Sequence, residues 1–244
     1  MRIPRIHTEQ ALGEGLALAL ESGPANHVAR VLRMGEGDAL VLFNGDGLEY
    51  PATITHADKR AVELQLDAPR ENDLESPLAV ELGIGISRGD RMDWVLQKAT
   101  ELGVSAVVPL FTERCEVKLK GERLEKKLLH WRQVIVSACE QCGRNRLPRL
   151  GAPIALEQWL GDCSAERRFV LHHRATPATG REAPASVALA VGPEGGLSDQ
   201  EIETCAAAGF EPLTLGPRVL RTETAPLAAL AILQAQWGDM AAQR

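Results

Sequence analysis

The sequence predicts a two-part chain, in which a small β-sheet or β-barrel precedes an α/β domain with a mainly parallel sheet. Three observations predict it. Short apolar runs separated by turn residues fill the first part, and a polar stretch without hydrophobic periodicity follows at 67–77. From there on, segments of strand and helix character alternate. Because 244 residues suffice for two modest domains, we expect them at 1–72 and 73–244.

The first part is expected to contain three strands, at 39–43, 48–54 and 61–66. The first two are separated by the turn sequence Asn-Gly-Asp-Gly at 44–47, and Asp58 and Lys59 precede the third. The boundary stretch DAPRENDLESP carries two prolines, which disfavour continued helix or central strand.

The second part is expected to alternate between strands and helices. Its longest helix has apolar residues at steps of four and three, so one apolar stripe runs along it and forms either core or a subunit interface. The stripe consists of Leu124, Leu128, Trp131, Ile135, Ala138 and Cys142. The strands are expected at 78–86, 105–110, 168–171, 186–191 and 212–215, and the helices at 91–102, 123–142, 198–208 and 224–237.

Composition places the chain among ordinary globular proteins, with 45% apolar and 25% charged residues. No apolar run reaches the roughly 18 residues needed to cross a bilayer, and no apolar segment follows the N-terminal arginines, so we expect a cytoplasmic protein. The odd number of cysteines fits reduced thiols. No second Cys/His pair accompanies Cys139 and Cys142, which favours core packing over a metal site.

Charge is unevenly distributed along the chain. The formal net charge is -6, yet residues 76–150 carry an excess of basic side chains. A basic segment in an acidic protein is what a localised phosphate-contact surface requires. For the basic run at 118–127, a solvated helix face is an equally good interpretation.

The first candidate site is the sequence VGPEGGLS at 191–198, between an apolar strand and a helix. Its three glycines allow a sharp turn and close approach to a ligand. Ser198 and Glu201 have the spacing of a capping box. The glycine spacing matches neither a dinucleotide fingerprint nor a phosphate-binding P-loop, so the pattern alone leaves a plain turn and a ligand loop open.

The second candidate site is the connection at 213–226, which also joins a strand to a helix. Thr222 or Thr224 is expected to cap that helix, and Pro226 suits its first turn. Capping does not explain the charges of Arg218, Arg221 and Glu223. Between two apolar elements they would be costly without partners, which favours site residues.

Together the two connections resemble the RsmE family of SPOUT methyltransferases, which methylate N3 of a uridine in 16S ribosomal RNA. The resemblance rests on GPEGG at 192–196 and LGPRVLRTETA at 215–225, and it extends over nearly the whole chain. Further similar segments are QKATELGV at 97–104, TER at 112–114, Glu140, Gln141, Arg144 and Pro148. The front of the chain resembles the family's PUA-like RNA-binding domain at RIPR (2–5), His27, Val28, VLR (31–33), Gly37 and Asp38.

The resemblance implies a SPOUT-type domain with a C-terminal trefoil knot behind a small PUA-like β-barrel. It also implies a homodimer, S-adenosylmethionine as the cofactor, and no metal ion. The two strand-end loops would wrap the cofactor. The expected cofactor-binding residues are Leu171, His172, Gly192, Pro193, Glu194, Gly195, Gly196, Leu215, Gly216, Leu220, Thr224 and Ala225.

For chemistry, we expect Arg221 to stabilise the uracil anion or a neighbouring phosphate, and Glu223 to orient the base or accept its proton. A purely structural ion pair is an equally good interpretation of these two residues. The partner is expected to be 16S ribosomal RNA, within the small ribosomal subunit. Arginine side chains fit phosphate oxygens, and the expected RNA contacts are Arg2, Arg5, Arg33, Arg88, Arg91, Arg144 and Arg146.

Two rival functions remain open at this point. One is a nucleotide-binding transferase or hydrolase that uses the loop at 192–196 as a phosphate cradle. The other is an RNA-binding protein that has kept the fold without the chemistry. Binding of nucleotide instead of a methyl donor would identify the first, and RNA affinity without cofactor binding would identify the second.

Overall fold

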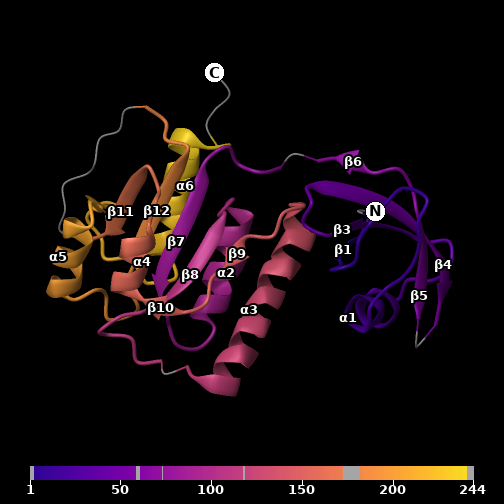
Figure 1. Ribbon diagram of the computed structural model, residues 1–244, viewed down its shortest axis with the longest axis horizontal. Coiled ribbons are helices and arrows are strands. Elements are labelled where there is room, and N and C mark those ends of the chain that lie inside the picture. Colours follow the sequence, from indigo (N-terminus) through magenta and orange to yellow (C-terminus); the bar gives the residue numbers. More distant parts are fainter. Residues whose placement is uncertain (1–2, 59–60, 73, 118, 173–181, 241–244) are drawn as a thin grey trace. The chain divides into compact units, whose positions relative to one another are not determined.

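The computed structural model describes residues 3–58, 61–72, 74–117, 119–172 and 182–240, and it divides into two compact units (Figure 1). Unit 1 comprises Met1–Glu75 and Cys139–Leu147, and unit 2 comprises Ser76–Ala138 and Pro148–Arg244. A segment from within the expected second domain, Cys139–Leu147, therefore packs as part of unit 1.

Unit 1 is built on a mostly antiparallel sheet with the strand order β1-β3-β4-β5-β2, and β6 pairs with β4. The expected strands at 39–43, 48–54 and 61–66 are confirmed, although β4 runs three residues further than expected. Among the described residues no pairing joins β1 to β2, so the sheet is open and a closed barrel is not found. The elements are β1 (Arg5–His7), β2 (Ala17–Ala19), α1 (Ser22–Asn26), the π-helix η1 (His27–Val31), β3 (Ala39–Phe43), β4 (Leu48–Ala57), β5 (Val62–Leu66) and β6 (Arg70–Glu71).

The core of unit 1 follows the two-residue period of its strands. In β5 the residues Val62, Leu64 and Leu66 are buried and alternate with exposed polar ones. They pack with Leu42 of β3 and Ile54 of β4. This is the alternation expected of a sheet with one face on a core and one face toward water.

Unit 2 contains a seven-stranded sheet with the order β10-β8-β7-β12-β11-β13, and β9 pairs with β8. Every pairing in it is parallel, which confirms the expected parallel sheet. The central strands read as continuous apolar runs because both sheet faces are covered. The strands are β7 (Ala79–Gly85), β8 (Ala106–Phe111), β9 (Arg149–Leu150), β10 (Ile154–Ala155), β11 (Arg167–Leu171), β12 (Ser186–Val191) and β13 (Glu211–Leu213).

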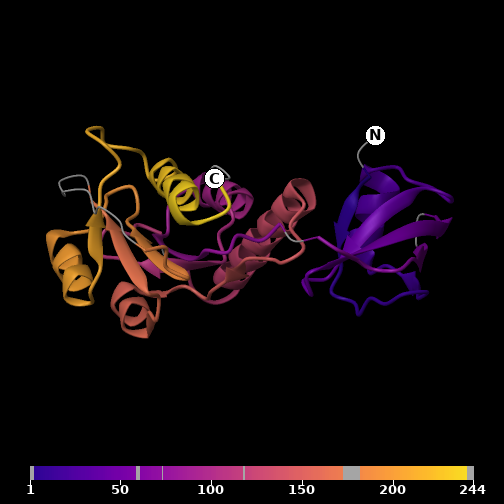
Figure 2. The same ribbon diagram turned by 90° about the horizontal axis from the view of Figure 1, so that it is seen from above.

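Helices cover both faces of this sheet (Figure 2). Helices α2 and α6 pack together on one face, and α4 and α5 lie on the other. The expected helices are confirmed to within two residues at each end. The helices are α2 (Arg91–Glu101), α3 (Gly121–Cys142), α4 (Leu156–Asp162), α5 (Asp199–Ala207) and α6 (Ala225–Trp237).

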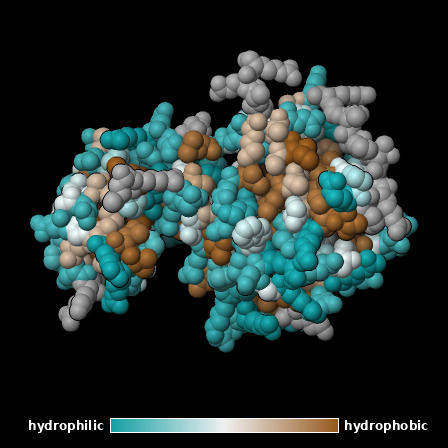
Figure 3. All heavy atoms as spheres, turned by 180° about the vertical axis from the view of Figure 1, so that it is seen from behind, coloured by the Kyte–Doolittle hydropathy of each residue, from teal (hydrophilic) through white to brown (hydrophobic). Residues whose placement is uncertain are grey.

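The apolar stripe of α3 is core over its second half, while Leu124, Leu128 and Cys142 are half-buried. Trp131, Ile135 and Ala138 are all at most 2% exposed in the single chain. The exposed apolar side chains of unit 2 include Trp94 of α2, Leu129 of α3 and Ile232 of α6. Figure 3 shows apolar residues gathered on the face of unit 2 that carries α2 and α6. In the described part of the chain, the search for a helix long and apolar enough to span a bilayer finds none.

Candidate functional site

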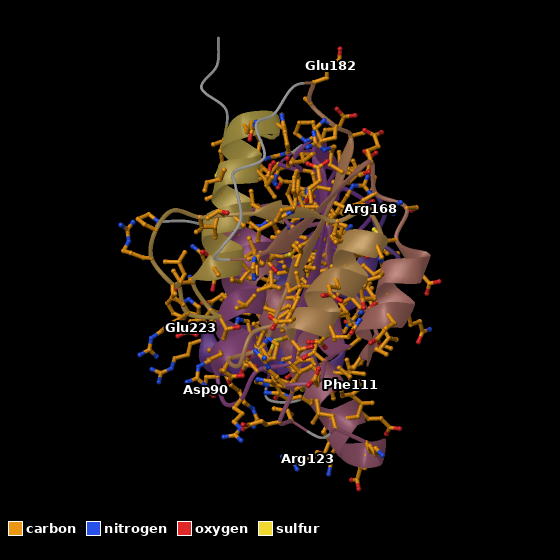
Figure 4. The ribbon with its side chains drawn as sticks, turned by 90° about the vertical axis from the view of Figure 1, so that its left-hand side faces the viewer. Asp90, Phe111, Arg123, Arg168, Glu182 and Glu223 are labelled. Atoms are coloured by element: carbon orange, nitrogen blue, oxygen red, sulfur yellow. The ribbon has the colours of Figure 1, made fainter. Side chains whose placement is uncertain are left out.

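A cavity of about 530 Å³ lies at the carboxyl ends of the strands of unit 2. The connections that follow β12 and β13 both line it, together with Leu171 and His172 at the end of β11. In Figure 4, Asp90, Phe111 and Glu223 lie toward this end of the unit, and Glu182, which precedes β12, lies at the opposite end. In open α/β sheets the carboxyl ends of the strands are where ligands bind.

The loop after β12 is shaped by its glycines. A Cβ on Gly192 would lie 2.6 Å from the backbone nitrogen of Leu197, so any larger residue would displace the backbone. Gly196 has a φ of +69°, which L-residues rarely adopt. The loop therefore closes tightly on itself and presents backbone groups to the cavity.

The loop is anchored at its far end by the expected capping box, which is confirmed. The Ser198 hydroxyl accepts a hydrogen bond from the Glu201 backbone N–H, and the Glu201 carboxylate accepts one from the Ser198 N–H at 2.8 Å. The other carboxylate oxygen of this buried Glu201 accepts from the backbone N–H of Glu113. One carboxylate thus ties the loop to the segment after β8.

Arg114 also holds the glycine loop. Its guanidinium donates hydrogen bonds to the carbonyl oxygens of Gly195 at 2.9 Å and of Leu197 at 3.3 Å. Sequence reasoning gave this arginine no role, although it lies in one of the similar segments. Only its place in the similar segment TER could have identified Arg114, because no local sequence pattern predicts which carbonyl oxygens a long side chain reaches.

The second connection is joined directly to the first. The Thr222 hydroxyl donates a hydrogen bond to the carbonyl oxygen of Gly192 at 3.0 Å. Thr224 is the N-cap residue of α6, but its side chain makes no capping bond. The expected helix-capping role of these threonines is therefore wrong, because the Thr222 hydroxyl bonds the other loop instead. Pro226 does lie in the first turn of α6, as expected.

The charges of the second connection are less enclosed than expected. The Arg221 side chain is 78% exposed, and Arg218 is exposed as well, so the argument from costly burial is wrong for both arginines. Only Glu223 is partly enclosed, with its side chain 22% exposed. Its Oε1 lies 4.0 Å from Nη1 of Arg221.

Arg91 links the carboxylates of the two loops. Its Nη1 lies 3.1 Å from Oε1 of Glu194, and its Nε lies 3.6 Å from Oε2 of Glu223. The same Glu194 oxygen accepts a hydrogen bond from the backbone N–H of Arg88. Arg91 was expected to contact RNA, but in the structure it lines the cavity and neutralises two carboxylates there.

The structure brings nearly all expected cofactor-binding residues to this cavity. Leu171, His172, Gly192, Pro193, Glu194, Gly195, Gly196, Leu215, Gly216, Leu220 and Ala225 line it, as do the expected catalytic residues Arg221 and Glu223. Thr224 is not among the lining residues. Residues of the lining to which sequence reasoning gave no cofactor role are Arg91, Val191, Leu197, Leu213, Arg218, Val219 and Thr222.

Two expected RNA contacts hold unit 1 together instead. Arg5, with its side chain 8% exposed, pairs with Glu49 at 2.8 Å. Arg144, 6% exposed, forms a forked pair with the carboxylate of Glu75. Buried guanidinium groups that are already bound to carboxylates are not available to a phosphate, so the structure does not support Arg5 and Arg144 as RNA contacts. Of the other candidates, Arg33, Arg88 and Arg146 are exposed, and Arg2 lies outside the described residues.

Of the five free cysteines, Cys139 and Cys205 are buried, and the other three are half-buried. Burial raises the pKa of both the Cys139 and the Cys205 thiol to about 12, so neither is a ready nucleophile. Within the described ranges no group of three or more His, Cys, Asp and Glu side chains could hold a metal ion.

Comparison with known proteins agrees with this arrangement. Residues 74–234 match the family model of an RNA methyltransferase domain, and residues 25–67 match that of an RNA methyltransferase PUA domain. The chain is 35% identical to the ribosomal RNA small subunit methyltransferase E of Buchnera aphidicola (subsp. Schizaphis graminum), over 98% of either chain.

Two solved structures are similar over 98% of this chain and 100% of their own. One is a methyltransferase from Legionella pneumophila in complex with bound SAM, with a TM-score of 0.95 and 44% identity. The other is a ribosomal RNA small subunit methyltransferase E from Neisseria gonorrhoeae bound to S-adenosyl methionine, with a TM-score of 0.93 and 39% identity.

Proposed function

The chain belongs to the ribosomal RNA small subunit methyltransferase E family, and we propose that it methylates N3 of a uridine in 16S ribosomal RNA. It is an S-adenosylmethionine-dependent ribosomal RNA methyltransferase with a SPOUT-type catalytic domain and a PUA-like domain. One observation carries the assignment of the site. The Thr222–Gly192 hydrogen bond holds the two family loops around a single cavity.

The cavity fits the cofactor in size and in chemistry. Its volume of about 530 Å³ falls within the range of small-ligand sites. Leu171, Leu215, Leu220 and Ala225 offer an apolar lining for the adenosine, and the glycine loop offers backbone hydrogen bonds. When bound, S-adenosylmethionine supplies an electrophilic methyl group.

The residues of the chain must then prepare the uracil. N3 of uracil carries a proton that has to leave before the nitrogen can act as a nucleophile. Glu223 is the group we assign to orient the base and to accept that proton, because it lines the cavity and is partly enclosed. Arg221, whose guanidinium is exposed beside it, is assigned to the developing uracil anion or to a neighbouring phosphate.

Neither rival function is favoured by this site. A phosphate cradle is not favoured, because the glycine spacing at 192–196 matches no phosphate-binding loop and two solved structures similar over 98% of this chain hold S-adenosyl methionine. A fold without chemistry would have no need for a carboxylate held at the cavity by Arg91.

The test is a methylation assay on small subunits from cells that lack this protein. We expect S-adenosylmethionine with a labelled methyl group to produce 3-methyluridine at one position, detected by mass spectrometry of the digested RNA. Glu223→Gln and Arg221→Ala should each lower turnover at saturating cofactor. Label on another atom or base would contradict the N3 assignment, and unchanged turnover in both variants would contradict the roles of these residues.

We further propose that the carboxyl-terminal part of unit 2 forms a trefoil knot. Support comes from the two loops that share one cavity, and from α6, which packs against α2 and β12, both far earlier in the chain.

We propose that the chain acts as a homodimer in the cytoplasm, on RNA within the small ribosomal subunit. Support for the dimer comes from apolar side chains that a single chain leaves in water. Trp94 of α2 is 52% exposed, Ile232 of α6 is 46% exposed, and Val219 of the second loop is 80% exposed. Exposed apolar groups of this size favour a protein interface.

A further inference from the structure

A second cavity, of about 490 Å³, lies in unit 2 between the loop after β7 and the first half of α3. Four basic side chains line it: Arg88 from the loop, and Arg123, Lys126 and Lys127 from α3. Asp90 is the acidic residue of the lining. Four of the thirteen basic residues at 76–150 thus line one cavity. In Figure 4, Asp90 and Arg123 lie toward the same end of the unit as Glu223.

Two of the four basic groups, Arg88 and Lys126, are only loosely engaged. Arg88 pairs with Glu116, and Lys126 with Glu122, in pairs whose side chains are all more than 60% exposed. Exposed pairs of this kind add little stability and exchange partners readily. Lys127 lies 3.3 Å from Asp93. Within the part of the chain that the structure describes, no carboxylate is paired with Arg123.

A buried donor in the same cavity lacks an acceptor. Trp131 is fully buried and lines the cavity, and its indole Nε1–H has no hydrogen-bond partner among the described residues. Indole N–H groups usually find an acceptor when they are buried. Three exposed cations, Arg88, Arg123 and Lys126, together with an unused N–H donor indicate an anionic ligand with several acceptor oxygens, which is the chemistry of a phosphate group.

The basic cavity adjoins the cofactor cleft. The backbone N–H of Arg88, in the loop that lines the basic cavity, donates a hydrogen bond to Glu194 of the glycine loop at 2.8 Å. Arg91, which follows this loop, lines the cofactor cleft. An anion in the basic cavity would therefore be close to the substrate of the methyl transfer.

We propose that the basic cavity binds a backbone phosphate of the substrate RNA near the nucleotide that is methylated. This inference rests on the proposed function, because it takes RNA as the substrate. Phosphate contacts fix the register of a nucleic acid on a protein, while contacts to the bases select the sequence. The cavity thus positions the target uridine in front of the cofactor.

The test compares Arg123→Gln with Arg132→Gln, an exposed arginine of the same helix that is outside the cavity lining. Affinity for 16S ribosomal RNA is measured over a series of salt concentrations. We expect Arg123→Gln to weaken binding about fivefold or more and to lower the slope of log affinity against log salt by about 0.7, the value for one lost contact to single-stranded RNA. Arg132→Gln should change neither quantity, and neither variant should change cofactor affinity.

Trp131→Phe is the second variant, since it removes the N–H and keeps an aromatic ring in the core. It should weaken RNA binding at an unchanged salt slope. Equal affinity and slope in Arg123→Gln and Arg132→Gln, together with unchanged binding by Trp131→Phe, would overturn the phosphate site. If the unaltered chain transferred no methyl group but the salt response held, the proposed function would fail and the phosphate site would stand.

Discussion

At the residue scale, Arg91 decides where Glu223 lies. Its planar guanidinium contacts Glu194 with one nitrogen and Glu223 with another, whereas a lysine would have to reach both carboxylates from a single nitrogen. Because each carboxylate belongs to a different loop, this one side chain also fixes the distance between the loops. Arg91 is therefore a positioning residue for the proposed proton acceptor.

The first prediction follows from this arrangement. Arg91→Gln should lower kcat by about 10- to 100-fold, less than the roughly 100- to 10,000-fold that general acid–base catalysis contributes, since Glu223 loses its support but keeps its carboxylate. Arg91→Lys should recover part of the loss. Cofactor affinity, measured by calorimetry, should change only severalfold in either variant. A large loss of cofactor affinity with unchanged kcat would contradict the positioning role.

The second prediction separates two glycines of one loop. A Cβ at position 192 would collide with backbone atoms, whereas one at position 195 would meet only the side chain of Arg114, at 3.1 Å. Gly192→Ala should abolish measurable cofactor binding in calorimetry, and Gly195→Ala should retain it with a loss of about tenfold or less. Equal losses in the two variants would contradict the argument.

The charged residues also show what the sequence could not predict. Arg5 and Arg144 resemble surface arginines in their sequence context, yet each finds a carboxylate far along the chain, Glu49 and Glu75 respectively. Such pairs depend on tertiary contacts and leave no local periodicity. Arg221, conversely, was expected to be enclosed between two apolar elements, yet its side chain is 78% exposed at the cavity.

At the scale of elements, α2 and α3 are tied together through Asp93. This carboxylate lies 2.5 Å from Nε2 of His130 and 3.3 Å from Nζ of Lys127, both on α3. Burial raises the pKa of Asp93, but the hydrogen bonds and positive charge of His130 and Lys127 outweigh it and hold the pKa below the ordinary value. The ionised form therefore stabilises the fold.

The third prediction uses the direction of that shift. A lowered pKa in the folded state gives stability that is fully present above the unfolded pKa of about 3.9 and is lost as the pH falls through the folded value. Asp93→Asn should lower the free energy of unfolding by about 1 kcal/mol at neutral pH. Urea titrations should show this difference shrinking below about pH 4. A difference that persists undiminished at low pH would contradict the ion-pair explanation.

Element length explains which parts of the fold the sequence predicts. Long periodic segments such as α3 and α6 and apolar strands such as β12 were expected within two residues of their bounds. Strands of two or three residues, such as β1 and β9, were missed because they are too short to show a period. The seven-residue α4 was missed as well, although its Leu156, Trp159 and Leu160 are buried.

At the scale of the whole molecule, the topology could not have come from periodicity. Alternating strands and helices predict a parallel sheet, but an ordinary doubly wound sheet would satisfy the same pattern. The expectation of a knot came only from the resemblance of 192–196 and 215–225 to a family. The sequence also could not predict that Cys139–Leu147 belongs to unit 1, since nothing local marks that segment as part of another unit.

The fourth prediction concerns assembly. Ile232 of α6 and Trp94 of α2 are large apolar side chains that are about half exposed in the single chain, on two helices that pack together. A charge in the middle of an apolar interface is left unpaired when the interface forms, so Ile232→Asp should convert the dimer to a monomer in sedimentation experiments. Leu129→Asp on α3, where the exposed fraction is 60%, is the matched control and should leave the dimer intact. A dimer that survives Ile232→Asp but is lost in Leu129→Asp would place the interface on α3. If the wild-type chain sedimented as a monomer at micromolar concentration, the dimer itself would be contradicted.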